Sequence, residues 1–135
     1  MKKILLTLLC GFTLFAGEIT WYKDYAQAQK VALQSNKILL VLVTTDVCPW
    51  CNKLKKETLK DPSIIAKITD KFVALELNRD RDTYPEAFRT RMVPTTFFAD
   101  KTGKPLMRPA LGYHDVETYD SYLNDAIRKA ASLPH

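Results

Sequence analysis

The residues best suited to chemistry are Cys48 and Cys51, in the stretch TTDVCPWCNK. Redox dithiols, half zinc sites and haem attachment points all share this two-residue spacing. A structural zinc site takes four cysteine or histidine ligands, yet there is no second cysteine pair and His114 and His135 are the only histidines. Haem attachment requires histidine directly after the second cysteine, where Asn52 stands. The pattern therefore predicts a redox pair and no metal site.

The neighbouring segments predict where this pair lies. Residues 37–45, KILLVLVTT, form a near-continuous apolar run typical of a central strand buried on both faces. Pro49 is well suited to the first position of a helix, so we expect a helix over residues 49–59. Cys48 then lies at the helix amino end, where unpaired N–H groups and the helix dipole favour the thiolate. These positions make Cys48 the predicted nucleophile and the more buried Cys51 the resolving thiol.

The amino-terminal segment has the layout of a secretory signal peptide. A short basic start precedes an apolar run over residues 4–16, which ends in small residues. We therefore expect a leader over residues 1–17, export to a bacterial periplasm, and one mature domain over residues 18–135 without stable membrane insertion. Two alternatives stay open: an uncleaved anchor helix, and a lipoprotein acylated at Cys10.

Composition and charge limit the function further. The formal net charge is +5, but the basic residues are scattered, so nothing favours a nucleic-acid partner. Without the leader, the chain keeps only the two cysteines of the pair. A disulfide that closes so short a loop gains little stability, because the entropic benefit grows with loop length. The pair is therefore predicted to serve chemistry rather than stability.

The remaining segments predict a single α/β domain with a mixed sheet. Helices are expected at 21–34, 49–59, 62–69 and 83–90, with a last one capped by Asp115, and strands at 37–45, 71–78, 93–100 and 104–112. Pro105 and Pro109 confine the last strand to a sheet edge.

Several of these segments together resemble the thioredoxin-like family. The resemblance extends from about residue 36 to residue 128, through KILLVLV, the Cys-Pro-Trp-Cys motif, MVPTTFFADKTGK and Gly112. Within the family, KKETLKDPSI and the block from PTTFFADKTGKPL to GY look most like the C-terminal domain of the inner-membrane thiol:disulfide interchange protein and its small exported relatives. The resemblance implies a thioredoxin fold with a central mixed sheet flanked by helices.

The resemblance also implies a substrate-binding surface. Val93-Pro94 is expected to be a cis peptide facing the cysteines, with a backbone that pairs with an extended substrate segment. The alternative is a trans proline that starts a strand. Gly112, with no side chain, would let the partner chain approach closely. Trp50 is expected either to contact the partner's peptide or to pack back on the domain.

One departure from the family concerns proton transfer. The buried aspartate expected six residues before the first cysteine is replaced by Leu42, and the second acid of the interchange-protein domain by Lys55. Glu76, within FVALEL, is a candidate proton acceptor for Cys51 if burial raises its pKa. The alternative is a strand glutamate that reaches solvent or pairs with a lysine.

The sequence therefore predicts an exported thiol:disulfide oxidoreductase that reduces protein disulfides through Cys48 and Cys51. It would need no bound cofactor, and its electrons would come from an inner-membrane thiol carrier. Two alternatives remain. The first is a periplasmic dithiol oxidant, suggested by Pro49 and Val93, and the second is a non-catalytic module that binds copper(I) or a cysteine-containing client.

Overall fold

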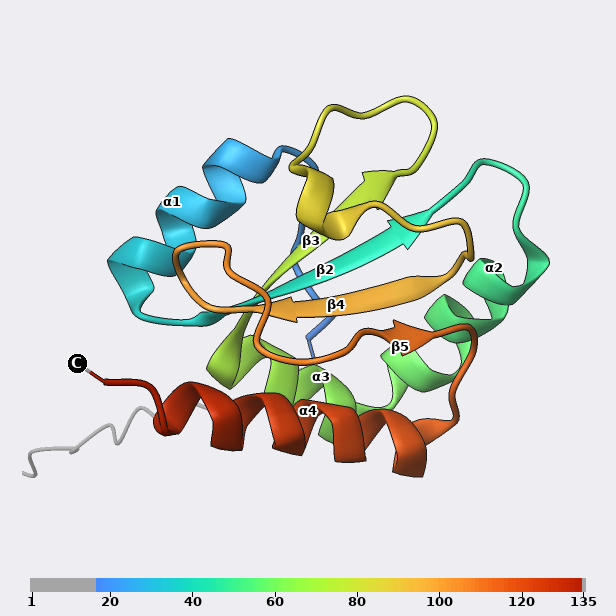
Figure 1. Ribbon diagram of the computed structural model, residues 1–135. Coiled ribbons are helices and arrows are strands. Elements are labelled where there is room, and N and C mark those ends of the chain that lie inside the picture. Colours follow the sequence, from blue (N-terminus) through green and yellow to red (C-terminus); the bar gives the residue numbers. More distant parts are fainter. Residues whose placement is uncertain (1–16, 135) are drawn as a thin grey trace, which may run out of the picture.

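The computed structural model describes residues 17–134 (Figure 1). Its elements are β1 (Trp21–Tyr22), α1 (Tyr25–Ser35), β2 (Ile38–Thr44), α2 (Pro49–Lys56), the 3₁₀ turn η1 (Thr58–Lys60), α3 (Pro62–Lys71), β3 (Phe72–Asn78), the 3₁₀ turn η2 (Glu86–Phe88), β4 (Thr95–Ala99), β5 (Ala110–Leu111) and α4 (Val116–Ala131).

One five-stranded mixed sheet organises the domain, in the order β1-β3-β2-β4-β5. β3 runs parallel to β1 and β2, whereas β4 runs antiparallel to both β2 and β5. Helix α1 covers one face, and α3 and α4 cover the other (Figure 1). The predicted α/β class and thioredoxin fold are confirmed.

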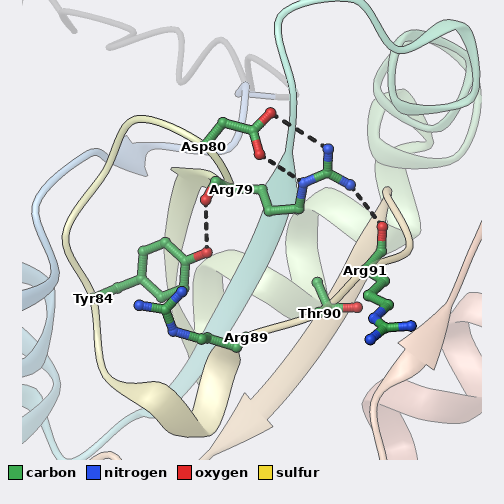
Figure 2. A pocket seen from close by; sticks show the side chains of 6 residues that line it. All are labelled: Arg79, Asp80, Tyr84, Arg89, Thr90 and Arg91. Carbon is green, nitrogen blue, oxygen red and sulfur yellow. Dashed lines mark hydrogen bonds and ion pairs between the residues drawn. The ribbon is translucent and has the colours of Figure 1, made fainter.

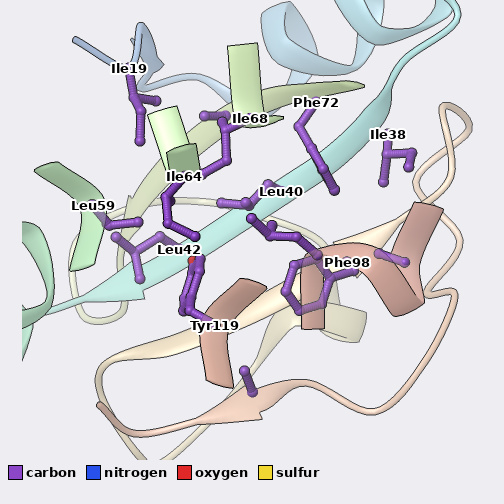
Figure 3. Close-up of a cluster of buried hydrophobic side chains, with 14 of the residues drawn as sticks. Ile19, Ile38, Leu40, Leu42, Leu59, Ile64, Ile68, Phe72, Phe98 and Tyr119 are labelled. Carbon is purple, nitrogen blue, oxygen red and sulfur yellow. The ribbon is translucent and has the colours of Figure 1, made fainter. Parts of the chain in front are cut away.

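β2 has both faces buried, as its apolar run predicts. Alternate residues face opposite sides of a strand, so Leu40 and Leu42 join the cluster against α3 and α4. Figure 3 shows this cluster, with Phe98 of β4 and Tyr119 of α4 packed beside β2. Val41 and its alternate neighbours join the second cluster, against α1. β2 is therefore held by contacts on both faces and by two neighbouring strands.

Proline and aspartate residues mark the helix starts, as predicted for Pro49 and Asp115. Pro49 and Pro62 each stand in the first turn of a helix, and Asp61 accepts hydrogen bonds from two backbone N–H groups of α3. Asp115 accepts one from the N–H of Thr118 at the start of α4.

The first helix begins later than the sequence predicts. Trp21–Tyr22 forms β1, paired with Ala74 and Leu75 of β3, and α1 starts only at Tyr25. Asp24 caps α1 by accepting a hydrogen bond of 2.9 Å from the N–H of Gln27. Strand pairing with β3 thus outweighs the helical periodicity of this short stretch.

Three more elements differ from the prediction. The helix expected at 49–59 ends at Lys56, and the 3₁₀ turn η1 follows it. The helix expected at 83–90 is only η2, a single 3₁₀ turn. The strand expected at 104–112 is reduced to an isolated bridge between Pro105 and Ala99 and to the two residues of β5. Pro105 and Pro109 lack the N–H that a continuous strand would donate, so regular pairing cannot extend between these points.

The hydroxyl pair of Tyr119 and Thr96 offers a test of the packing between α4 and the sheet. Both residues are buried, and their hydroxyls share a hydrogen bond of 3.0 Å. Tyr119→Phe should lower the free energy of unfolding by about 1–3 kcal/mol, because it leaves the Thr96 hydroxyl buried and unpaired. Combining it with Thr96→Val should recover most of that loss in urea denaturation. A double variant no more stable than Tyr119→Phe alone would contradict this account.

Candidate active site

The two cysteines form a disulfide at the amino end of α2, with their Cα atoms 5.2 Å apart. Cys48 is the N-cap residue and Pro49 begins the helix, so the loop after β2 places the pair near the carboxyl end of β2. The Cys48 and Cys51 residues are 7% and 2% exposed, respectively. Cys48 is therefore the cysteine that an incoming sulfur reaches more easily.

The local backbone favours negative charge on Cys48. The N–H of Cys51 donates a hydrogen bond of 3.1 Å to the Cys48 sulfur. Donation from a backbone N–H stabilises a thiolate more than a thiol, and the positive end of the α2 dipole acts in the same direction. Of the two cysteines, Cys48 is thus the better placed to be the attacking thiolate after reduction.

The segment before β4 lies near the same end of β2. β2 and β4 are antiparallel, with Val43 opposite Thr95, so the end of β2 and the start of β4 lie side by side. The Val93–Pro94 peptide bond is cis. Within residues 17–134, no backbone hydrogen bond engages the N–H or carbonyl of Val93. This peptide is therefore free to pair with an extended segment from another chain.

Gly112 has a conformational role that sequence reasoning missed. Its φ is +80°, and its N–H donates a hydrogen bond of 2.8 Å to the Pro94 carbonyl. An added Cβ would meet only the Met92 sulfur, at an ordinary distance of 3.7 Å. The backbone conformation, rather than crowding within the domain, therefore requires glycine here. Its expected role in partner approach stays a prediction.

Four exposed apolar residues lie next to the disulfide or to the Val93–Pro94 segment. Val47, Trp50 and Met92 are close to them in sequence, whereas Leu111 is paired with Thr95 at the start of β4. Each of them is at least half exposed: Val47, Trp50, Met92 and Leu111. We call this set the apolar rim. Trp50 is 56% exposed and its ring also packs on Tyr113, with the two ring centroids 5.9 Å apart, so its expected contact with a partner's peptide stays a prediction. Large exposed apolar side chains gathered near one site indicate a surface for another molecule.

Glu76 lies opposite Leu42 in the sheet register and within reach of three side chains. Its carboxylate pairs with Lys55 and with Lys23, the latter at 2.8 Å, and accepts a hydrogen bond of 3.1 Å from the Thr44 hydroxyl. Burial acts to raise the pKa of Glu76, but the two lysines outweigh it and lower the pKa below its ordinary value.

Glu76 therefore adopts the second of the two alternatives, a strand glutamate paired with lysines, and the raised pKa that the proton-acceptor alternative required is contradicted. An ionised carboxylate held by two ammonium groups is a weak base, so this part of the proton-acceptor argument fails. The Lys55 ammonium is thus paired with Glu76. Lys53 lies instead over the ring of Trp50, 5.1 Å from the centroid.

A hollow lined by Arg79, Tyr84 and Arg91 lies over the segment between β3 and β4 (Figure 2). Arg79 pairs with Asp80 and donates a hydrogen bond of 2.6 Å to the Arg91 carbonyl. Tyr84 donates one of 3.0 Å to the Arg79 carbonyl. These bonds hold the segment that leads into Val93–Pro94, a role that sequence reasoning missed.

Within residues 17–134, no three histidine, cysteine or acidic side chains group into a metal site.

Gly112→Ala tests the conformational requirement. We expect it to lower the free energy of unfolding by about 1–2 kcal/mol, because a left-handed φ strains any residue with a Cβ. Urea denaturation measures the change. Gly112→Asn is the matched comparison, because asparagine adopts a left-handed φ at a lower cost than alanine does. Equal stabilities for the two variants would contradict the requirement.

Glu76→Gln tests the ion pairs. The pKa of Glu76 in the folded state is below its ordinary value, so its carboxylate stabilises the fold at a pH above the ordinary pKa. This contribution is lost as the pH falls through the lowered pKa. The variant should therefore be less stable than the wild type at neutral pH, and the gap in melting temperature should close in acid. A gap that widens in acid would contradict the assignment. The pH profile of disulfide exchange in the same variant tests the proton-acceptor prediction separately.

Comparison with known proteins places the fold in a family. A family model described as a thioredoxin-like domain matches residues 25–127. Mouse anterior gradient protein 3 is 31% identical over 89 residues, which are 64% of this chain and 52% of that protein. The thioredoxin-related protein DsbJ of Chlamydia pneumoniae is 34% identical over 85 residues, 56% of this chain and 24% of that protein. The chain thus spans about half, or less, of these curated relatives.

Solved structures agree on the fold. A thioredoxin from Thermus thermophilus superposes with a TM-score of 0.72 and 21% identity, covering 86% of this chain and 92% of its own. The oxidised C-terminal domain of DsbD from Neisseria meningitidis gives 0.63 and 18%, covering 79% and 99%. The chain therefore belongs to the thioredoxin-like family and carries a Cys-X-X-Cys disulfide at the start of α2.

Proposed function

We propose that this thioredoxin-like protein is an exported oxidoreductase that reduces disulfides in protein clients, with Cys48 as nucleophile and Cys51 as resolving thiol. The observation that carries the proposal is the disulfide itself, in which Cys48 is the more exposed residue and its sulfur accepts a hydrogen bond from a helix N–H.

Two exchange steps reduce one client disulfide. The Cys48 thiolate attacks a client disulfide, forming a mixed disulfide and releasing one client sulfur, which takes up a proton. Cys51 then loses its proton and attacks the Cys48 sulfur, releasing the second client thiol and forming the Cys48–Cys51 disulfide. Two electrons pass to the client, and a partner's dithiol restores the pair by the reverse exchange. No bound cofactor takes part.

The surroundings of the disulfide support a polypeptide client. The unpaired Val93 peptide can add an extended client strand, and the apolar rim, which includes Trp50, can bury client side chains. Gly112 leaves the approach to Pro94 without a side chain. We therefore assign client binding to Trp50, Val93, Pro94 and Gly112.

The direction of transfer and the location rest on resemblance and on the leader. The proteins similar to this chain include DsbJ, the DsbD C-terminal domain and a DsbH oxidoreductase, and an exported member of this group fits an inner-membrane thiol carrier as electron donor. Cys10 and nearly all of the predicted leader lie outside the described residues. In the part that the structure describes, no helix is both long and apolar enough to cross a bilayer.

Oxidation of clients is the second candidate. The hydrogen bond from the Cys51 N–H stabilises the Cys48 thiolate, and a stabilised thiolate makes the dithiol form more favourable and the disulfide a stronger oxidant. This hydrogen bond favours oxidation of clients, whereas the resemblance favours their reduction. The reduction potential of the Cys48–Cys51 pair distinguishes the two directions.

Cysteine variants test the division of roles. Cys51→Ser should accumulate a mixed disulfide between Cys48 and a client, because no thiol remains to resolve it. Cys48→Ser should trap far less, since Cys51 is nearly inaccessible. Non-reducing gels after mixing each reduced variant with insulin give the measurement. Stronger trapping by Cys48→Ser would reverse the assignment, and equal absence of trapping would reject protein disulfides as substrates.

A further inference from the structure

The segment after β5 connects the two halves of the active site. Gly112 binds the Pro94 carbonyl on one side. On the other side, the carbonyl of His114 accepts a hydrogen bond of 2.6 Å from the hydroxyl of Thr58, which is fully buried in η1. A short stretch of chain therefore links the Val93–Pro94 segment to the end of α2.

Tyr113 lies between these two anchor points and contacts one face of α2. Its ring is 5.9 Å from that of Trp50, and its hydroxyl donates a hydrogen bond of 2.8 Å to the Glu57 carboxylate. The Lys53 ammonium lies 4.7 Å from the centroid of the Tyr113 ring and 5.1 Å from that of Trp50. We call these four residues, Trp50, Lys53, Glu57 and Tyr113, the tyrosine clasp.

The spacing along α2 makes the clasp one surface. Trp50, Lys53 and Glu57 are separated by three and four positions, so they lie on one face of the helix. Lys53 makes a cation–π contact with each ring, and such contacts are favourable even at exposed sites. The hydrogen bond to Glu57 raises the pKa of Tyr113, so its hydroxyl remains a donor at neutral pH. Tyr113 is thus held near both ends of α2.

We propose that Tyr113 is a positioning residue for the exchange reaction, which holds the Val93–Pro94 segment at a fixed separation from Cys48 at the start of α2. This inference rests on the proposed function and deepens it. A polypeptide client must pair with Val93 while its sulfur meets Cys48, so its reaction depends on that separation. A small disulfide meets Cys48 without using the Val93 peptide. Tyr113 therefore distinguishes protein clients from small disulfides.

The test compares two substrates across four variants of the full chain. Tyr113→Ala removes the contacts of the Tyr113 side chain with Trp50, Lys53 and Glu57. Tyr113→Phe removes only the hydrogen bond to Glu57, and Lys53→Met removes only the positive charge. Tyr22→Ala is the matched control, a partly buried tyrosine in β1 that packs against the cluster beneath α1. The readouts are kcat/KM for reduction of insulin and for reduction of dithiobis-nitrobenzoate.

We expect Tyr113→Ala to lower kcat/KM for insulin about tenfold and for the small disulfide by no more than about twofold. Tyr113→Phe should keep most of the wild-type kcat/KM for insulin. The value for Lys53→Met should lie between those of Tyr113→Ala and Tyr113→Phe. The Tyr22→Ala control should show no preference between the substrates. Equal losses on both substrates, or no loss on insulin, would overturn the positioning role.

Amide hydrogen exchange separates this inference from the proposed function, because it needs no client. In Tyr113→Ala, the Gly112 amide should exchange about tenfold faster, since its bond to Pro94 opens more often, while β2 amides keep their rates. An unchanged Gly112 amide would reject the positioning role whatever the activity shows. A wild-type protein that reduces neither substrate would instead reject the proposed function.

Discussion

The burial of β2 on both faces is the constraint on which the other parts depend. Its residues alternate between two apolar clusters, and a shift of one residue would exchange every side chain between them. The same register aligns β3 and β4 with β2. Because the register is fixed, the loop that ends in Cys48 and the segment that ends in Pro94 emerge at one edge of the sheet.

The charges near the disulfide are largely satisfied by contacts within the domain. Lys55 is paired with Glu76, and the Lys53 ammonium contacts the rings of both Trp50 and Tyr113. The stabilisation available to a Cys48 thiolate therefore comes mainly from the backbone, through the Cys51 N–H and the start of α2. Backbone dipoles are fixed by the helix and lose less of their effect to salt than mobile surface lysines do. The lysines contribute instead to the placement of α2 against the rest of the domain.

Local chemistry explains which features the sequence could predict. The apolar run of β2 and the helix start at Pro49 depend on neighbouring residues alone, and both are confirmed. β1 at Trp21–Tyr22 was missed because two residues form a strand only when a partner strand is present. The pKa of Glu76 depends on Lys23 and Lys55, which are distant in the sequence, and the φ of Gly112 depends on its bond to Pro94. These errors therefore concern contacts between distant segments, whereas the strand expected at 104–112 is interrupted by its own prolines, Pro105 and Pro109.

The reduction potential of the Cys48–Cys51 pair, measured by equilibration with glutathione redox buffers, tests the central claim most directly. A reductant of protein disulfides should have a potential near that of thioredoxin, about −270 mV, at which the disulfide is comparatively stable and the dithiol gives up its electrons. A potential near about −120 mV would mean that the dithiol is the favoured form. That result would contradict the proposed direction and make the protein a donor of disulfides.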